Sequence, residues 1–105
     1  MKELPIELLE RMAGVLKILA HPHRLKIVEM LTVKPEAPVH EIVAHLGLPQ
    51  ATISQHLNQM RRAGLVKARR AGRKVWYSIA DPSSLTILDC IRRKQGKGEG
   101  DGGRR

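Results

Sequence analysis

The sequence of 105 residues has few aromatic residues and little cysteine: no phenylalanine, one tryptophan, one tyrosine and one cysteine. A single cysteine, Cys90, cannot form a disulfide within the chain. Sheet-type readers of single-stranded nucleic acid stack bases on several aromatic side chains, so a chain with only Trp76 and Tyr77 is not expected to be one. No apolar run reaches the about 20 residues that span a membrane.

The first residues, "MKELPIELLERM", contain three glutamates and no apolar signal region. We therefore expect no secretory signal. Together with the lone cysteine, this indicates a reducing, cytoplasmic compartment. The length suits one domain, and the small core of such a domain would gain stability from association into a dimer.

Positive charge is concentrated in the second part of the chain. Residues 1–60 hold six Lys or Arg and six Asp or Glu. Residues 61–105 hold thirteen Lys or Arg and only four Asp or Glu. Seven basic residues and no acidic one fall within residues 61–74. Clustering of this density is typical of a surface that binds a polyanion.

Apolar residues at helical spacing predict helices over residues 5–20, 22–31, 39–46 and 50–63. Gly47 and Gly64 stand where helix-ending glycines are expected. Two short helices joined by a tight turn are typical of a helix-turn-helix. The next residues, to about 80, alternate as two strands around "RRAGR", where Gly72 suits a tight turn. A last helix is expected over 82–94. We expect one domain over 1–94 and a disordered, glycine-rich tail over 95–105.

The helix predicted over 50–63 has two distinct faces. Ile53, Leu57 and Met60 form an apolar stripe, and the remaining surface carries amides, hydroxyls and arginine but no acid. These are the groups that contact base edges and phosphates in the major groove. The candidate DNA-binding residues of this helix are Gln50, Thr52, Ser54, Gln55, Asn58 and Arg62.

The predicted hairpin that follows supplies a second candidate surface. Four cations lie near its tip, and they would repel one another unless an anion were present. We therefore expect a wing that contacts phosphates through Arg69, Arg70, Arg73 and Lys74.

These segments resemble the ArsR-type family of winged helix-turn-helix repressors. The resemblance rests on "LAHPHRLKIVEML" and above all on "ATISQHLNQMRRAGLVKARRAGRKVWYSI". It implies a mainly α fold with a β-hairpin wing. It also implies a homodimer built on the first and last helices, and repression through an inverted-repeat operator. On those helices we expect the interface to include Leu8, Met12, Leu85, Leu88 and Ile91. Gln50, Ser54 and Gln55 match base-reading positions, whereas Ala51 replaces a common serine.

The family resemblance also implies release from DNA by a metal, a metalloid or a redox signal. The family's cysteine site on the third helix is absent from "VHEIVAHLG". Its site on the last helix is incomplete, because "SSLTILDCIRRKQ" offers Asp89 and Cys90 but no histidine. Sulfide-sensing members use two cysteines. We therefore expect no metal or other cofactor, and the inducer stays open.

Two histidines flank Pro22, at positions 21 and 23. A proline at the first helical position predicts that His21 caps a helix, and we expect the two side chains to diverge rather than to share a metal. His40 and His45 do not share a helix face, and His56 is expected to pack or to lie near phosphate. Cys90 is either an inert interface residue or a redox sensor, and facing its dimer mate it could form an intersubunit disulfide.

No arrangement of nucleophile, base and orienting group is present, so an enzyme is not expected. Two alternatives to an inducible repressor stay open. One is a ligand-independent or nucleoid-like DNA binder of the same fold. The other is a protein-interaction module that uses the basic wing.

Overall fold

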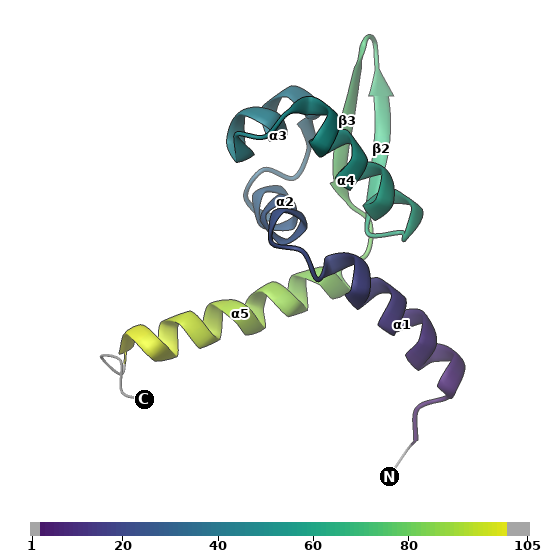
Figure 1. The fold of residues 1–105 in the computed structure, drawn as a ribbon, viewed down its shortest axis with the longest axis vertical. Helices are drawn as coiled ribbons and strands as arrows, with labels where there is room; N and C mark the ends of the chain where they lie inside the picture. The colour runs from purple at the N-terminus through teal and green to yellow at the C-terminus, as the bar shows by residue number, and fades with distance from the viewer. Residues whose placement is uncertain (1–2, 101–105) are drawn as a thin grey trace.

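The computed structural model describes residues 3–100 and contains five helices and three strands over this range (Figure 1). The elements are α1 (Ile6–Leu19), α2 (Pro22–Val33), β1 (Ala37–Pro38), α3 (Val39–Leu46), α4 (Gln50–Arg62), β2 (Val66–Ala71), β3 (Lys74–Ile79) and α5 (Ser83–Gly100). The predicted fold class, mainly α with a β-hairpin wing, is confirmed. Helix α5 extends to Gly100, beyond the expected end near Lys94. The rest of the predicted tail, 101–105, lies outside the described residues.

Glycines end both helices of the helix-turn-helix, as expected. Gly47 adopts a left-handed φ of 71° and donates to the carbonyl of Val43. After α4, Gly64 has a φ of 79°, and the amides of Gly64 and Leu65 donate to the carbonyls of Arg61 and Met60. This bond pair is the Schellman motif, which satisfies carbonyls that a helix end would otherwise leave unpaired.

The wing is a hairpin extended by a third, short strand. β2 and β3 pair in antiparallel fashion with Ala71 opposite Lys74, so Gly72 and Arg73 form a two-residue turn. β1 pairs with the other edge of β3, in the order β1-β3-β2. No strand is predicted here from the sequence, and Pro35 and Pro38 lie on either side of Ala37. Proline can occupy an edge strand where its missing N–H faces no partner, and a two-residue strand carries no detectable periodicity.

One core joins the helices to the base of the wing. Helix α2 is central to it and packs against α1, α3, α5 and β3. The side chains with no solvent-exposed surface include Ile27, Val28, Ile42, Ile53, Leu57, Met60 and Leu65. The expected inward face of α4 is therefore confirmed, and the opposite face of the helix points to solvent.

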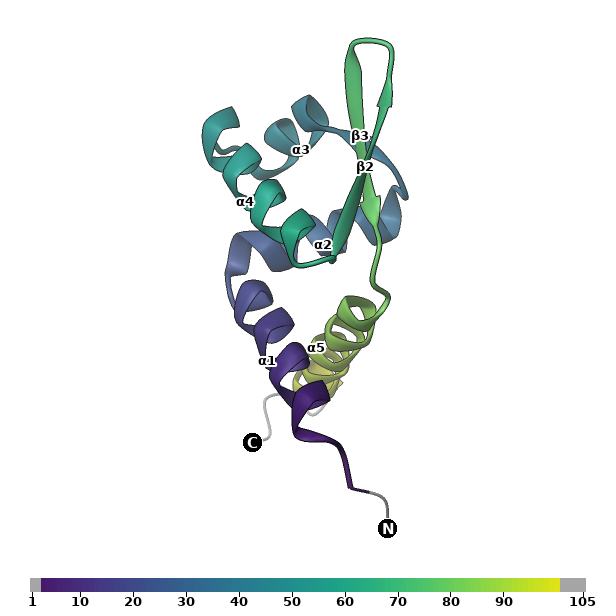
Figure 2. The ribbon, with the colours of Figure 1, turned by 90° about the vertical axis from the view of Figure 1, so that its right-hand side faces the viewer.

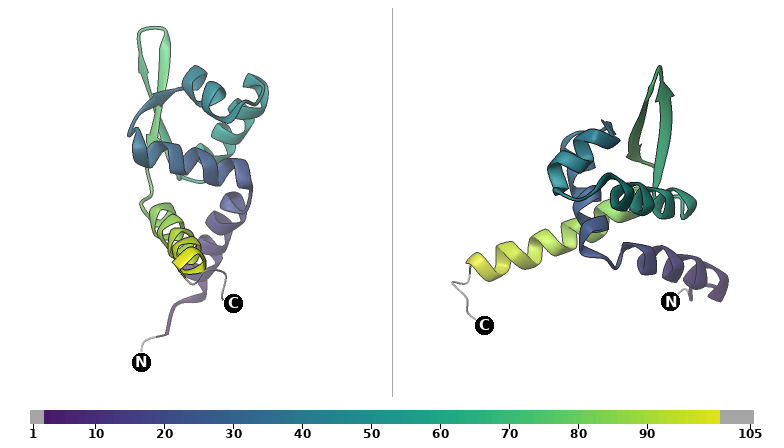
Figure 3. Two further views of the ribbon diagram at one scale, coloured as in Figure 1. Left: turned by 90° about the vertical axis from the view of Figure 1, so that its left-hand side faces the viewer. Right: turned by 45° about the horizontal axis from the view of Figure 1, so that its top comes forward.

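The molecule is extended rather than spherical. Helices α1 and α5 run away from the body in different directions, and the hairpin projects from the opposite end (Figures 1, 2 and 3). The principal extents are 48 × 40 × 20 Å and the radius of gyration is 15.7 Å, whereas a compact domain of this length has about 13 Å. Between residues 3 and 100, no helix combines the length and the apolar character needed to cross a membrane.

Asp81 secures the start of α5. Its Oδ1 accepts a hydrogen bond from the backbone N–H of Ser83 at 2.9 Å, and its carbonyl accepts one from the hydroxyl of the buried Ser84. The hydrogen bonds from Ser83, first from its backbone and then from its side chain, lower the pKa of the Asp81 carboxyl.

We predict that Asp81→Ala lowers the free energy of unfolding by about 1 kcal/mol at pH 7, as loss of a helix cap does. Because the folded-state pKa lies below the unfolded one, this contribution is present above the unfolded pKa of about 4 and is lost as pH falls through the folded-state value. Urea denaturation at one protein concentration, at pH 7 and in acid, measures it. The control is Asp89→Ala, which removes an exposed carboxylate; equal destabilisation by both would contradict the capping role.

Candidate nucleic-acid interface

The outward face of α4 is polar and free of acidic residues. Gln55, Asn58 and Arg62 are exposed and follow one another at three- and four-residue steps, so they share one side of the helix. Gln50 is exposed at the first turn, whereas Thr52 and Ser54 lie half-buried at the flanks. All six predicted residues thus lie outside the buried stripe, and four of them, Gln50, Gln55, Asn58 and Arg62, are exposed.

The start of α4 and the wing lie on either side of one hollow. Its volume is about 280 Å³, and its lining includes Gln50 of α4, Arg73 and Lys74 of the hairpin, and His40 of α3. No side chain caps the first turn of α4, where the residue before the helix is Pro49. Uncapped amides at a helix start attract anions. The start of α4, two cations of the hairpin and Gln50, a candidate for base contact, therefore lie around the same hollow.

The four wing cations do not have the same surroundings. Arg69 makes a two-point ion pair with Glu36, with Nε to Oε2 at 3.0 Å and Nη2 to Oε1 at 2.8 Å. The hydrogen bond from Arg69 lowers the pKa of Glu36, and the same bond raises that of Arg69. Arg70 and Arg73 are exposed and belong to no ion pair among the described residues. Arg69 is therefore less available to phosphate than Arg70 and Arg73.

The two histidines around Pro22 do not diverge, and this expectation is wrong. The ring centroids of His21 and His23 lie 5.3 Å apart, and His56 of α4 lies 4.5 Å from His21 and 6.0 Å from His23. The helix-start interpretation is confirmed, because Nδ1 of His21 accepts from the backbone N–H of His23 at 3.2 Å. The sequence missed the cluster because its third member is 33 residues away from the second.

Arg24 of α2 links this cluster to α1 and α4 through hydrogen bonds. Its Nε donates to Nδ1 of His56 at 3.0 Å, and its Nη1 donates to the carbonyl of Ile18 at 3.1 Å. His56 is only 7% exposed. Of the two alternatives expected for it, packing in the core or lying near phosphate, the structure shows the first. Burial lowers the pKa of His56, and the charges of His21, Arg24 and His23 lower it further. Both effects favour the neutral form of the His56 ring.

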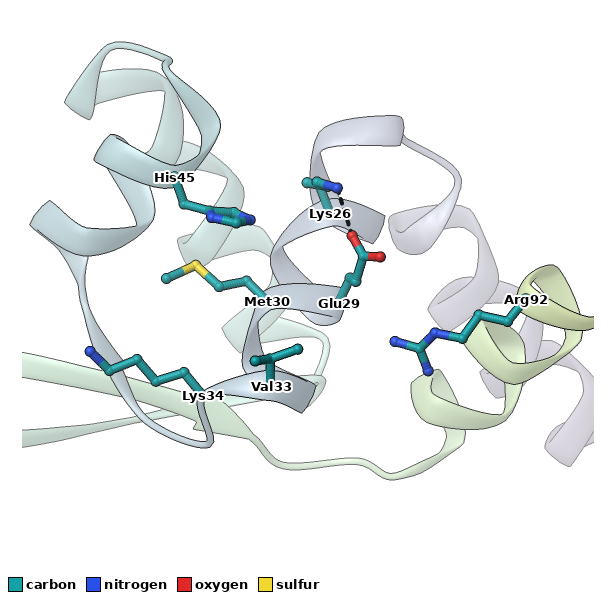
Figure 4. Close-up of a pocket in the computed structure, with 7 residues that line it drawn as sticks. All are labelled: Lys26, Glu29, Met30, Val33, Lys34, His45 and Arg92. Atoms are coloured by element: carbon teal, nitrogen blue, oxygen red, sulfur yellow. Dashed lines mark ion pairs between the residues drawn. The ribbon is translucent and has the colours of Figure 1, made fainter. Parts of the chain in front are cut away.

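A second hollow, of about 410 Å³, lies between α2, α3 and α5 (Figure 4). Lys26, Lys34 and Arg92 surround it together with Glu29 and His45. Lys26 pairs with Glu29 at 2.8 Å, and Lys34 pairs with Glu41. Arg92 pairs with Asp89 at 3.4 Å. All three cations around this hollow are therefore already paired with carboxylates of the chain.

The residues expected at a dimer interface differ in exposure. Leu8, Met12 and Leu85 are half-buried, Leu88 is buried and Ile91 is 43% exposed. Ile6, Leu9 and Leu16 of α1, which were not assigned to the interface from the sequence, are 60%, 44% and 50% exposed. Asp89 and Cys90 of α5 are exposed, and among the described side chains they join no group of three or more metal-ligating residues.

Comparison with known proteins identifies relatives of the whole fold. Residues 21–68 match the model of the arsR family of bacterial regulatory proteins. The transcriptional repressor PagR of Bacillus anthracis is 46% identical over 83 residues, covering 79% of this chain and 83% of PagR. The repressor SmtB of Mycobacterium tuberculosis is 42% identical over 88 residues, covering 83% of this chain and 64% of SmtB.

Solved structures agree with these matches. The crystal structure of PagR has a TM-score of 0.76 at 40% identity, covering 83% of this chain and 99% of that one. The structure of NolR from Sinorhizobium fredii has a TM-score of 0.78 at 35% identity, covering 91% and 98%.

Proposed function

This chain belongs to the arsR family of bacterial regulatory proteins, and we propose that it represses transcription as a homodimer bound to an inverted-repeat operator. It is a winged helix-turn-helix transcriptional regulator that binds DNA. The observation that carries the proposal is the exposed, acid-free face of α4 beside a wing with two arginines, Arg70 and Arg73, outside every ion pair of the described residues. Such a face places side chains on base edges while the wing contacts phosphates.

The extended shape supports a dimer. Helices α1 and α5 leave the body without forming a compact shell around it (Figure 1). Large apolar side chains are exposed on both, namely Ile6, Leu9 and Leu16 of α1 and Ile91 of α5. A second copy that covered these helices would bury this surface. The two-fold axis of the dimer would then place the second copy of α4 about 34 Å from the first.

We predict that Leu9→Glu or Ile91→Glu raises the dimer dissociation constant at least about 100-fold. Burying one such side chain contributes about 1.5–3 kcal/mol, and each substitution occurs twice in the dimer. Sedimentation equilibrium measures the constant. Val33→Glu is the matched control, because Val33 is 82% exposed but lies on α2. A dimer that tolerates the first two substitutions as well as the third would rule out this interface.

The operator proposal is tested by a hydroxyl-radical footprint on DNA from upstream of the protein's own gene. Two protected patches, related by a two-fold axis and about one helical turn apart, are expected. A single protected patch, or uniform protection along the whole DNA, would contradict the dimeric operator complex.

We further propose that the repressor acts in the cytoplasm and that a small inducer or a redox signal releases it. The exposed Cys90 supports a redox signal, because a thiol on α5 is accessible to oxidants. At the family's two metal positions we propose that no ion binds, since α3 has no cysteine and α5 offers only Asp89 and Cys90.

A further inference from the structure

Three histidines meet where α2 begins against α4. His21 precedes α2, His23 belongs to its first turn and His56 lies on the inner side of α4. Each ring offers one nitrogen, and these three atoms lie within 4.8 Å of one another. No other group of three or more possible metal ligands occurs among the described side chains.

The spacing is close to what a metal ion requires. Nitrogen ligands about 2.0–2.1 Å from a tetrahedral zinc ion lie about 3.4 Å from each other, so the nitrogens need to approach by at most about 1.4 Å. Small side-chain rotations of His21 and His23, which are at least partly exposed, supply such a movement. His56 is held by the core and provides a fixed point.

We propose that His21, His23 and His56 bind one divalent transition-metal ion of the zinc type, with water completing the coordination. Imidazole nitrogens suit zinc, nickel and copper(II), whereas soft ions such as copper(I) prefer sulfur. The site lies between α2 and α4, away from the family's two positions on α3 and α5. The charge of Arg24 opposes the ion, so we expect micromolar rather than much tighter binding.

Metal binding changes a hydrogen bond that holds α4. In the structure Nδ1 of His56 accepts from Nε of Arg24. A neutral imidazole carries one proton, so an accepting Nδ1 places that proton on Nε2. An ion at Nδ1 displaces Arg24, and an ion at Nε2 requires the proton to move to Nδ1, which then no longer accepts. Either way the Arg24–His56 bond is replaced by a metal link from α2 to α4.

This replacement couples the ion to DNA binding, a step that rests on the proposed function. His56 follows Gln55 directly on α4, so a shift of the His56 ring acts on the helix that carries the candidate base-reading residues. By linkage, an ion that changes DNA affinity has its own affinity changed by DNA to the same extent.

Titration of the full-length chain, without an added histidine tag, tests the site directly and without DNA. With Co²⁺ as the probe, we expect one ion per chain and the visible absorption of a four-coordinate site, with no thiolate-to-cobalt band from Cys90. Competition with Zn²⁺ should remove this absorption. No saturable binding up to about 100 µM, or a thiolate band, would overturn the proposal.

Two variants separate the site from general surface binding. His23→Gln is expected to weaken binding at least tenfold. The hydrogen bond between His21 and His23 uses the backbone N–H of His23 rather than its ring, so the circular dichroism spectrum should stay unchanged. His40→Gln, on exposed α3 surface, is expected to bind as the parent chain does. Equal binding by the parent chain and His23→Gln would overturn the proposal.

The coupling has its own readout. DNA affinity of the parent chain is measured by fluorescence anisotropy with and without Zn²⁺, and we expect a change of at least fivefold that His23→Gln abolishes. An identical response in both proteins would overturn the coupling. Absence of DNA binding under either condition would instead contradict the proposed function, which the cobalt titration does not depend on.

Discussion

Replacing Arg70 and Arg73 together with alanine is expected to weaken binding to every DNA sequence by roughly 10- to 100-fold near physiological salt. Each exposed ion pair with a phosphate contributes up to about 1 kcal/mol, and the double substitution removes two arginines from each protomer of a dimer. The slope of log affinity against log salt is expected to flatten by about 0.9 for each phosphate that the protein no longer neutralises. Anisotropy titrations at several salt concentrations measure both quantities.

The control for this prediction is Arg69→Ala. Arg69 is a cation of the same strand as Arg70, but it is paired with Glu36. Removing it is expected to cost less than Arg70→Ala in affinity and to leave the salt slope nearly unchanged. A larger loss of affinity from Arg69→Ala than from Arg70→Ala would show that the wing contacts DNA through its other face.

The second large effect is expected at Gln55, whose substitution by alanine should reduce the preference for operator over random DNA. A side chain that pairs with a base edge at two points contributes about 1–3 kcal/mol of discrimination in each half-site. Binding to random DNA should change little, because the interactions with phosphates remain. Competition of labelled operator with scrambled DNA measures the ratio directly.

Gln59→Ala is the matched control for Gln55→Ala. It removes the same side chain from the same helix, but Gln59 is half-buried and lies off the line of Gln55, Asn58 and Arg62. The ratio of operator to random binding should stay close to that of the parent chain. If Gln55→Ala preserves the ratio and Gln59→Ala lowers it, the recognition face is rotated from the one assigned.

The local elements of the fold could be predicted from the sequence because each has its own pattern. The apolar stripe of Ile53, Leu57 and Met60 defined the inner face of α4 before its neighbours were known, and Gly47, Gly64 and Gly72 marked turns that require a positive φ. Alternation in the hairpin likewise predicted β2 and β3.

Interactions between distant segments could not be predicted in this way. The strand β1 exists only because Ala37 and Pro38 meet β3, and the ion pair of Arg69 depends on Glu36, which lies 33 residues earlier. The histidine cluster could not be predicted for the same reason. Local geometry around Pro22 concerns only His21 and His23, and nothing in the α4 pattern shows that His56 faces them.

The end of α5 shows a different limit. Glycine lowers helix propensity by about 1 kcal/mol per residue, so the sequence favoured an end near Lys94. The structure continues the helix through Gly96 and Gly98 to Gly100. Propensity is a weak guide to where a terminal helix stops.

The central claim, sequence-selective DNA binding by a dimer, is tested most directly by one titration. Fluorescence anisotropy compares DNA from upstream of the protein's own gene with a scrambled duplex of equal length, at two salt concentrations. The account predicts at least about 1,000-fold tighter binding to the upstream DNA and a steep loss of affinity with salt for both. Equal affinity for the two duplexes would contradict operator recognition while leaving the fold intact.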